Sequence, residues 1–179
     1  MRFFAVFAVL CALGSPLIAA TSSTSAMEAQ MLQLVNRDRA ANGVGPLTMS
    51  PALAAVARAH SMDMVQSGFF SHTSPNTGDV EARLARGGVA WRAYAENISY
   101  NSSVAESQAS LMRSTGHRAN LLNPTYDTIG IGIVQNGRNV FVTQNFIKTG
   151  KSKRSATADP TNQPTKQPTK SRRWNLPVY

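Results

Sequence analysis

Hydrophobic residues recur at helical spacing in the first expected element, a helix from about Met27 to Asn42. The repeating apolar positions are Met27, Met31, Leu34 and Val35. Ser25 and Glu28 stand three residues apart at its start, which is the pattern of a capping box, and Gly43 supplies a stop. Residues 36–39 read Asn-Arg-Asp-Arg, so we expect them to form the solvent-exposed face of this helix.

A second helix is predicted between Ser50 and Gly68, because Ser50 is a favoured capping residue and Pro51 suits the first helical position. One stripe along this helix holds Leu53, Val56, Ala57, His60 and Met64. We expect His60 to be a hydrogen-bonded histidine of the core or of a pocket wall. It is therefore placed outside the functional site.

The next part of the chain predicts a short helix and then a strand. Asp79–Arg86 has a helical pattern that Gly87-Gly88 closes. Residues 89–100 favour extended chain, with Glu96 and Asn97 in or beside a strand.

A third long helix begins after a capping serine, either Ser102 or Ser103. One side of it carries Val104, Gln108, Leu111, Met112 and Thr115. We expect Gly116 to end this helix, which would put His117 just past the helix end. Residues 118–122 could then add one further turn.

From Thr128 onward the hydrophobic period changes to two, which is typical of strands. Isoleucines at 129, 131 and 133 alternate with glycines, and the glycines allow another element to pack closely. Asn136-Gly137 is a hairpin turn signal, and the return strand alternates from Val140 to Phe146. Helices flanking a late hairpin indicate an α+β domain.

The first 20 residues have the pattern of a cleaved signal peptide. Arg2 is followed by an apolar run, Phe3–Leu13, that is too short to span a membrane, and small residues precede a cut near Ala20. Cys11 is the only cysteine and lies in this run, so the mature chain would be exported without a disulfide. We expect a secreted or cell-envelope-associated monomer with no transmembrane segment after signal removal.

Residues 21–149 are expected to fold as one domain, and residues 150–179 to form a disordered tail rich in Lys, Pro and Thr. The net charge of residues 21–150 is +2, whereas residues 151–179 carry +6. A nearly neutral domain lacks the basic face of a specific nucleic-acid-binding fold. The tail is interpreted either as a tether to an anionic cell-envelope polymer or lipid surface, or as a solubilising spacer.

Three short stretches supply the candidate site: Phe70-Ser71-His72, Ala95-Glu96-Asn97 and Ser114-Thr115-Gly116-His117. Two imidazoles and a carboxylate suit a divalent metal such as zinc, and they also suit acid–base chemistry. Sequence spacing does not choose between these roles, and it leaves independent structural roles open as well.

The order and local context of these stretches resemble the CAP superfamily (cysteine-rich secretory, antigen-5 and pathogenesis-related proteins), and specifically its cysteine-free bacterial SCP-like branch. The resemblance covers roughly residues 27–148 and implies an α/β/α sandwich with a small antiparallel sheet between helical layers. It also implies a cleft with two His and two Glu. His72, Glu96 and His117 match three of these positions, whereas the second Glu is matched by Ser114. This departure affects any mechanism that uses two carboxylates.

The resemblance implies a non-enzymatic extracellular binding module whose cleft is formed by His72, Glu96, Ser114 and His117. The cleft would take a small apolar or lipid molecule, and His72 and His117 would bind zinc or another divalent cation weakly. Glu96 would then coordinate the metal or orient a bound water. Ser114 is expected either to cap a helix or to hydrogen-bond Glu96. The alternative is a hydrolase in the same cleft, with Ser71 or Ser114 as nucleophile and His72 or His117 as base.

Overall fold

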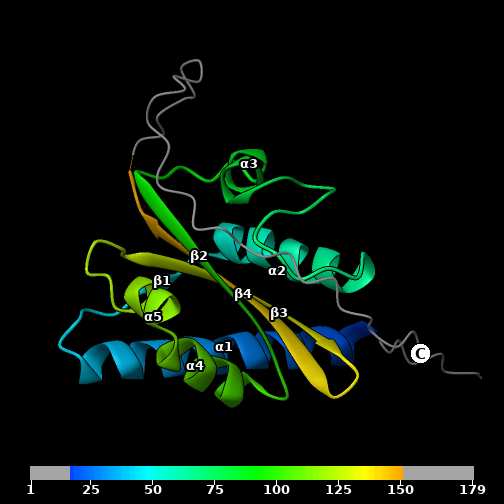
Figure 1. Ribbon diagram of the computed structural model, residues 1–179, viewed down its shortest axis with the longest axis horizontal. Coiled ribbons are helices and arrows are strands. Elements are labelled where there is room, and N and C mark those ends of the chain that lie inside the picture. The colour runs from blue at the N-terminus through cyan, green and yellow to red at the C-terminus, as the bar shows by residue number, and fades with distance from the viewer. Residues whose placement is uncertain (1–16, 151–179) are drawn as a thin grey trace, which may run out of the picture.

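A computed structural model describes residues 17–150 of the chain, with side chains from Ser23 onward. The expected tail beyond residue 150 lies outside the described residues, as does most of the expected signal peptide. The elements in chain order are α1 (Leu17–Ala41), β1 (Thr48–Met49), α2 (Pro51–Gln66), α3 (Val80–Arg86), β2 (Ala93–Asn101), α4 (Val104–Arg113), α5 (Thr115–Leu121), β3 (Thr128–Asn136) and β4 (Asn139–Lys148) (Figure 1). None of the described helices is long and apolar enough to cross a bilayer.

The four strands form one sheet in the order β1-β3-β4-β2. β4 pairs antiparallel with β3, as the hairpin pattern predicted, and it also pairs antiparallel with β2. The three long strands thus form the expected small antiparallel sheet, and the two-residue strand β1, which pairs parallel with the start of β3, makes the whole sheet mixed. No hairpin connects β1 to β3, and a long crossover leaves the strand direction free to be parallel.

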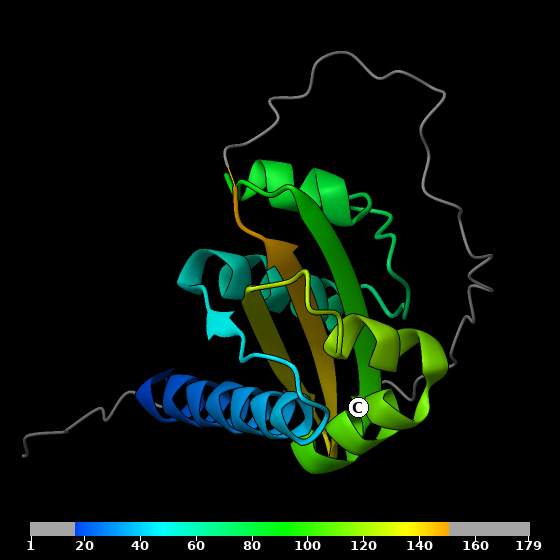
Figure 2. The same cartoon turned by 90° about the vertical axis from the view of Figure 1, so that its left-hand side faces the viewer.

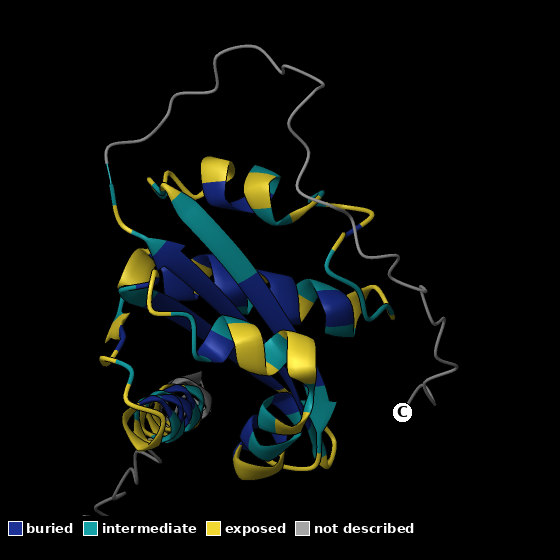
Figure 3. Cartoon of the chain, turned by 60° about the vertical axis from the view of Figure 1, so that its left-hand side comes forward, coloured by how far each residue is buried: buried dark blue, intermediate teal, exposed yellow. Residues whose placement is uncertain are grey.

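The sheet lies between two groups of helices, which confirms the α/β/α sandwich. In Figure 1, α2 and α3 lie above the strands, and α1, α4 and α5 lie below them. Figure 2 shows α1 running along the sheet with α4 beside it. Figure 3 shows the consequence for burial, because the strands are mostly buried while the outward sides of the helices are exposed.

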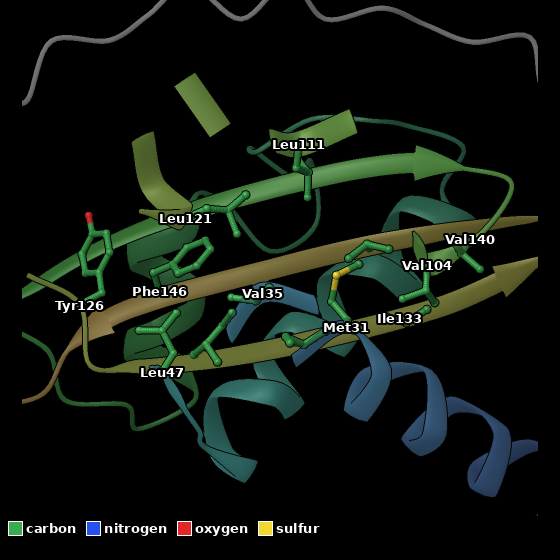
Figure 4. Close-up of a cluster of buried hydrophobic side chains, with 13 residues drawn as sticks. Met31, Val35, Leu47, Val104, Leu111, Leu121, Tyr126, Ile133, Val140 and Phe146 are labelled. Atoms are coloured by element: carbon green, nitrogen blue, oxygen red, sulfur yellow. The ribbon is translucent and has the colours of Figure 1, made fainter. Parts of the chain in front are cut away.

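The largest apolar cluster fills the space between the sheet and α1, α4 and α5 (Figure 4). Its buried members are Met31, Val35, Leu47, Val104, Leu111, Leu121, Tyr126, Ile129, Ile131, Ile133, Val140, Val142 and Phe146. The isoleucines of β3 and the even-numbered residues of β4 point into this cluster. The odd-numbered residues of β4 therefore face α2, as the contact of Ile147 with Leu53 and Leu84 confirms.

The glycines of β3 let α2 lie almost directly on the sheet. A Cβ placed on Gly130 would overlap the backbone of Leu53, and one on Gly132 would overlap the backbone of Ala57 and Arg58. The predicted close packing above these glycines is confirmed, and the element that packs there is α2.

The first helix differs most from its prediction. α1 begins at Leu17, before the expected cleavage point near Ala20, so Ser25 lies inside the helix and cannot cap it. Glu28 is buried and accepts two hydrogen bonds from Arg58 on α2, at 2.9 and 2.7 Å, and one from the backbone N–H of Ile133. The predicted capping box is therefore wrong, because Glu28 joins α1 to the other helical layer at the edge of the sheet.

Arg39 also contradicts the expected solvent-exposed face, because only 1% of it is exposed. Its guanidinium donates to the carbonyl oxygens of Gly45, Leu121 and Asn123 at 2.6, 2.7 and 3.1 Å. Two of these carbonyls belong to the end of α5 and the residues after it, where a helix leaves carbonyl groups without intrahelical partners. Arg39 thus fixes the end of α5 on α1.

The predicted third helix is interrupted earlier than expected. α4 ends at Arg113, Ser114 has extended backbone angles (φ −86°, ψ 122°), and α5 starts at Thr115. Gly116 therefore lies within α5 and does not end a helix, and His117 lies in the first turn of α5. Thr115, predicted for the buried side, is exposed. The predicted capping by Ser50 and by Ser103 is confirmed.

Candidate functional site

Strand β2 is an edge strand, and it places Glu96 and Asn97 on opposite faces of the sheet because successive strand residues alternate. Glu96 faces α3 and the loop that follows α2. Asn97 faces α5. The single Glu-Asn dipeptide therefore holds two separate groups of polar residues, one on each side of this edge.

The Glu96 carboxylate is buried and has two close partners. His72 Nδ1 lies 2.9 Å from Oε1, and Arg83 Nη2 donates to Oε2 at 2.7 Å. The exposed fraction of the side chain is 1% for Glu96 and 4% for Arg83, whereas it is 33% for His72. The imidazole of His72 thus has one edge against the buried Glu96, and about a third of the side chain is exposed.

The hydrogen bond to Glu96 selects one tautomer of His72. A carboxylate paired with an arginine accepts hydrogen bonds and does not donate them, so the hydrogen of neutral His72 belongs on Nδ1. Nε2 is then left with a lone pair. Glu96 therefore acts on a ligand through His72, in the same way that a carboxylate behind a metal-bound histidine orients the ring.

Arg83 also fixes the loop that carries His72, because its Nη1 donates to the carbonyl oxygens of His72 and Gly78 at 2.9 and 2.7 Å. Sequence reasoning missed Arg83. It lies three residues before Arg86, which is exposed, and no feature of the sequence distinguishes the two arginines.

A second anchor for this loop is Asp63 on α2. Its carboxylate accepts hydrogen bonds from Ser67, Ser74, Asn76 and Thr77. Burial raises the pKa of Asp63, but these hydrogen bonds outweigh burial and lower the pKa below its ordinary value. The loop is therefore held at both ends, by Asp63 and by Arg83, and His72 is presented from a fixed backbone.

His60 is fully buried, and its Nε2 lies 3.0 Å from the carbonyl oxygen of Ser71. The expectation of a hydrogen-bonded core histidine is confirmed. The same Nε2 lies 3.8 Å from Glu96, so His60 is a neighbour of the site that the sequence did not reveal. Burial lowers the pKa of His60 despite the opposing charge of Glu96, which favours the neutral imidazole.

His117 is held by polar contacts on the other face of β2. Asn97 donates to the carbonyl oxygen of His117 at 3.1 Å and accepts from Asn120 at 2.9 Å. Asn97 also donates to Gln144 in the core. Burial lowers the pKa of His117, and the charge of His72 lowers it further.

A cavity of about 330 Å³ opens beside β2. Its walls come from the loop after α2, from β2, α4 and β4, and from the start of α5; they are Phe69, Phe70, Ile98, Ser99, Tyr100, Asn101, Ser110, Leu111, Ser114, His117 and Phe141. Ser114 and His117 thus line one cavity. His72 and Glu96 do not line the cavity. Two of its lining residues are close to them in sequence: Phe70 lies two residues before His72, and Ile98 lies two residues after Glu96.

Ser114 occupies the N-cap position of α5, as one of its two predicted roles requires, but neither predicted side-chain hydrogen bond is present among the described residues. Its side chain makes no capping hydrogen bond to α5, and the hydrogen-bond partners of Glu96 do not include it. The structure therefore brings His72 to Glu96 by a hydrogen bond, and it places Ser114 and His117 in the lining of one cavity.

Direct coordination of a metal by Glu96 is not favoured, because both of its oxygens already accept hydrogen bonds from His72 and Arg83. Within residues 17–150, no group of three or more His, Cys, Asp or Glu side chains is arranged to hold a metal ion.

Comparison with known proteins identifies a matching family and two related sequences. The profile of the CAP family, described as the cysteine-rich secretory protein family, matches residues 32–146. The chain is 36% identical over 129 residues to YkwD of Bacillus subtilis, an uncharacterized protein, and 37% identical over 124 residues to YlbC, an uncharacterized membrane protein of the same organism. These matches cover 72% and 68% of this chain, but only 49% and 34% of the two relatives.

Solved structures give the same result. An extracellular SCP-domain protein from Bacillus anthracis superposes with a TM-score of 0.67 at 34% identity, covering 70% of this chain and 41% of that one. An outer surface protein of Borrelia burgdorferi has a TM-score of 0.66 at 16% identity, covering 71% of this chain and 96% of that one, which supports the fold alone. On the family profile, and on these sequence and structural matches, the chain belongs to the CAP family of cysteine-rich secretory proteins.

Proposed function

We propose that this CAP domain is a non-enzymatic extracellular binding module that holds a small apolar, lipid-like molecule in the cavity beside β2. An extracellular location is supported by the description of the Bacillus anthracis relative and by the signal-peptide pattern of residues 1–20.

The observation that carries this proposal is the composition of the cavity walls. Phe69, Phe70, Tyr100 and Phe141 converge from three segments that are distant in the sequence, and a volume of about 330 Å³ falls in the range of small-molecule sites. Polar groups are restricted to a few positions, including Ser110, Ser114 and His117. An apolar body with one polar end fits such a lining, because the polar end would meet the hydroxyls and the imidazole.

Filling the cavity should weaken binding without unfolding the domain. Ser110 is half-buried in the wall, so Ser110→Phe places a ring in the space that the ligand would occupy. We expect affinity for a medium-chain fatty acid, measured by calorimetry, to fall by about tenfold or more, the loss that follows from roughly 1.4 kcal/mol of blocked apolar contact.

The matched control is Ser102→Phe, which adds the same ring at an exposed position that does not line the cavity. It should bind as the wild type does. Equal affinities for all three proteins would place the ligand elsewhere and would contradict the proposal.

We also propose that zinc or another divalent cation binds weakly through His72 and His117. The donor chemistry is suitable, since neutral imidazole is a common zinc ligand, but two protein ligands are fewer than the three or four of strong sites. Glu96 would act behind His72, holding its ring through the hydrogen bond to Nδ1.

Zinc binding by calorimetry should be detectable at neutral pH and lost in both His72→Ala and His117→Ala. Glu96→Gln should weaken it by roughly 10–100-fold, the usual effect of losing a group that orients a ligand. Binding should fade as pH falls below about 6.5, because only neutral imidazole binds metal. The lowered pKa of His117 keeps that ligand neutral to a lower pH than an exposed histidine. No heat at neutral pH, or unchanged heat in both alanine variants, would remove the metal proposal.

A hydrolase in the same cleft is the alternative class. The His72–Glu96 hydrogen bond favours it, because a general base is usually oriented by a carboxylate. Its nucleophile is less well supported: within the described residues, no hydrogen bond joins Ser71 Oγ or Ser114 Oγ to either imidazole. Turnover of ester or peptide substrates that Ser114→Ala abolishes would favour this alternative over the binding module.

A further inference from the structure

A second cavity, of about 350 Å³, lies between α2 and α3. It shares no lining residue with the cavity beside β2. Its α2 wall is formed mainly by Ala52, Ala55, Val56 and Ala59, and α3 contributes Arg83 and Arg86. The three alanines are spaced three and four residues apart on one face of the helix and are exposed, so their small side chains leave room beside α2.

Two buried polar atoms of residues that line this cavity lack a hydrogen-bond partner within the described residues. They are Nδ1 of His60 and Nε of Arg83. The exposed fraction is 0% for His60 and 4% for Arg83. Buried polar groups are nearly always hydrogen-bonded, because leaving one without a partner is costly, so two such atoms on side chains that line one cavity indicate a missing partner.

The contacts of each side chain fix which hydrogen-bonding role its free atom plays. His60 Nε2 faces the carbonyl oxygen of Ser71, which can only accept, so the hydrogen of neutral His60 belongs on Nε2. Its Nδ1 is then an acceptor. Arg83 uses its two terminal nitrogens for Glu96, His72 and Gly78, and its Nε–H remains a donor.

The missing partner must therefore donate one hydrogen bond and accept another. A carboxylate cannot donate to Nδ1, and an ammonium group cannot accept from Nε–H. A hydroxyl group does both with a single oxygen atom. The alanine side of the cavity would meanwhile contact an apolar body attached to that hydroxyl.

We propose that the cavity between α2 and α3 is a second binding site, for a small neutral molecule with an apolar body and a hydroxyl group that pairs with His60 Nδ1 and Arg83 Nε. This site is separate from the cavity of the proposed function and does not depend on it. Arg83 links this site to Glu96, because it lines the cavity and also donates a hydrogen bond to the Glu96 carboxylate.

The test uses the full chain labelled with ¹⁵N, and benzyl alcohol as the probe. Long-range ¹H–¹⁵N spectra at neutral pH report the hydrogen bonding of each imidazole nitrogen. We expect benzyl alcohol to shift the His60 Nδ1 resonance in a saturable way. Toluene, which has the same ring and no hydroxyl, should bind about tenfold or more weakly, because the two polar atoms would stay unpaired.

Ala55→Leu places an exposed leucine in the cavity mouth and should weaken benzyl alcohol binding by about tenfold or more. Ala40→Leu is the matched control, on an exposed position of α1 outside the cavity, and should leave binding unchanged. The proposal would be overturned by an unshifted His60 resonance, by equal binding of toluene, or by full binding in Ala55→Leu. In those cases the two polar atoms are satisfied by an ordinary water molecule.

Discussion

Replacing Arg83 with Met should lower the free energy of unfolding by about 3–5 kcal/mol, measured by urea denaturation at neutral pH. The substitution keeps most of the side-chain length but leaves the carboxylate of Glu96, which is 1% exposed, without its cation. It also removes the donors to the carbonyl oxygens of His72 and Gly78. A buried charge that has lost its partner is much more costly than the intact pair.

Two further variants separate this explanation from a general effect of removing an arginine. Arg113→Met removes an exposed arginine whose partner Glu106 is also exposed, and should cost less than about 1 kcal/mol. Adding Glu96→Gln to Arg83→Met removes the uncompensated charge and should recover part of the loss. If Arg83→Met were as mild as Arg113→Met, the buried ion pair would not be what organises the site.

Gly132→Ala should destabilise the domain by about 3 kcal/mol or more, at the upper end of the usual cost of overpacking. The new Cβ would overlap the backbone of Ala57 and Arg58, so α2 as a whole would have to move away from the sheet. A flexible side chain could move aside, whereas a helix backbone packed over two strands cannot do so locally. Thermal or urea unfolding would measure the effect.

Gly116→Ala is the matched comparison and should have the opposite sign. Gly116 lies inside α5 with a negative φ, and no atom lies within 4 Å of a Cβ built there. Alanine at such a position stabilises by about 0.4–1 kcal/mol, mainly by restricting the unfolded chain. Destabilisation by Gly116→Ala would instead support the sequence-based expectation that this glycine ends a helix.

Elements with strong local signals were predicted from the sequence. Ser50 followed by Pro51 defines the start of α2, and Asn136-Gly137 defines the turn between β3 and β4, where Gly137 has a φ of +60°. The alternation of isoleucine with Gly130 and Gly132 predicted both the strand and its close packing. In each case the physical cause lies within a few residues.

Features that depend on distant partners were not predicted. Arg39 and Glu28 have the polar character of surface residues, yet their partners lie 82 and 30 residues away, in Leu121 and Arg58. Hydrophobic periodicity cannot distinguish a charged residue that is paired in the interior from one in water. The break between α4 and α5 was also placed wrongly. The chain leaves the helical conformation at Ser114, whose backbone is extended, and Gly116 lies inside α5.

In the candidate site, too, residues with a local sequence signal were predicted and residues that depend on distant partners were not. Local context and family resemblance pointed to His72, Glu96 and His117, and the structure joins the first two directly. Arg83 and His60 complete the surroundings of Glu96 from α3 and α2, and only the folded chain reveals that they meet there. The loop contacts of Asp63, 11 residues from Ser74, were equally invisible in the sequence.

Glu96, held by Arg83, orients His72 so that Nε2 is free for a ligand. Long-range ¹H–¹⁵N spectra of the free protein at neutral pH test this directly, because they assign the tautomer of each neutral histidine. We predict opposite tautomers for two neighbours: the hydrogen on Nδ1 of His72, facing Glu96, and on Nε2 of His60, facing the carbonyl oxygen of Ser71. A hydrogen on Nε2 of His72 would contradict the account, because Glu96 would then not orient that ring.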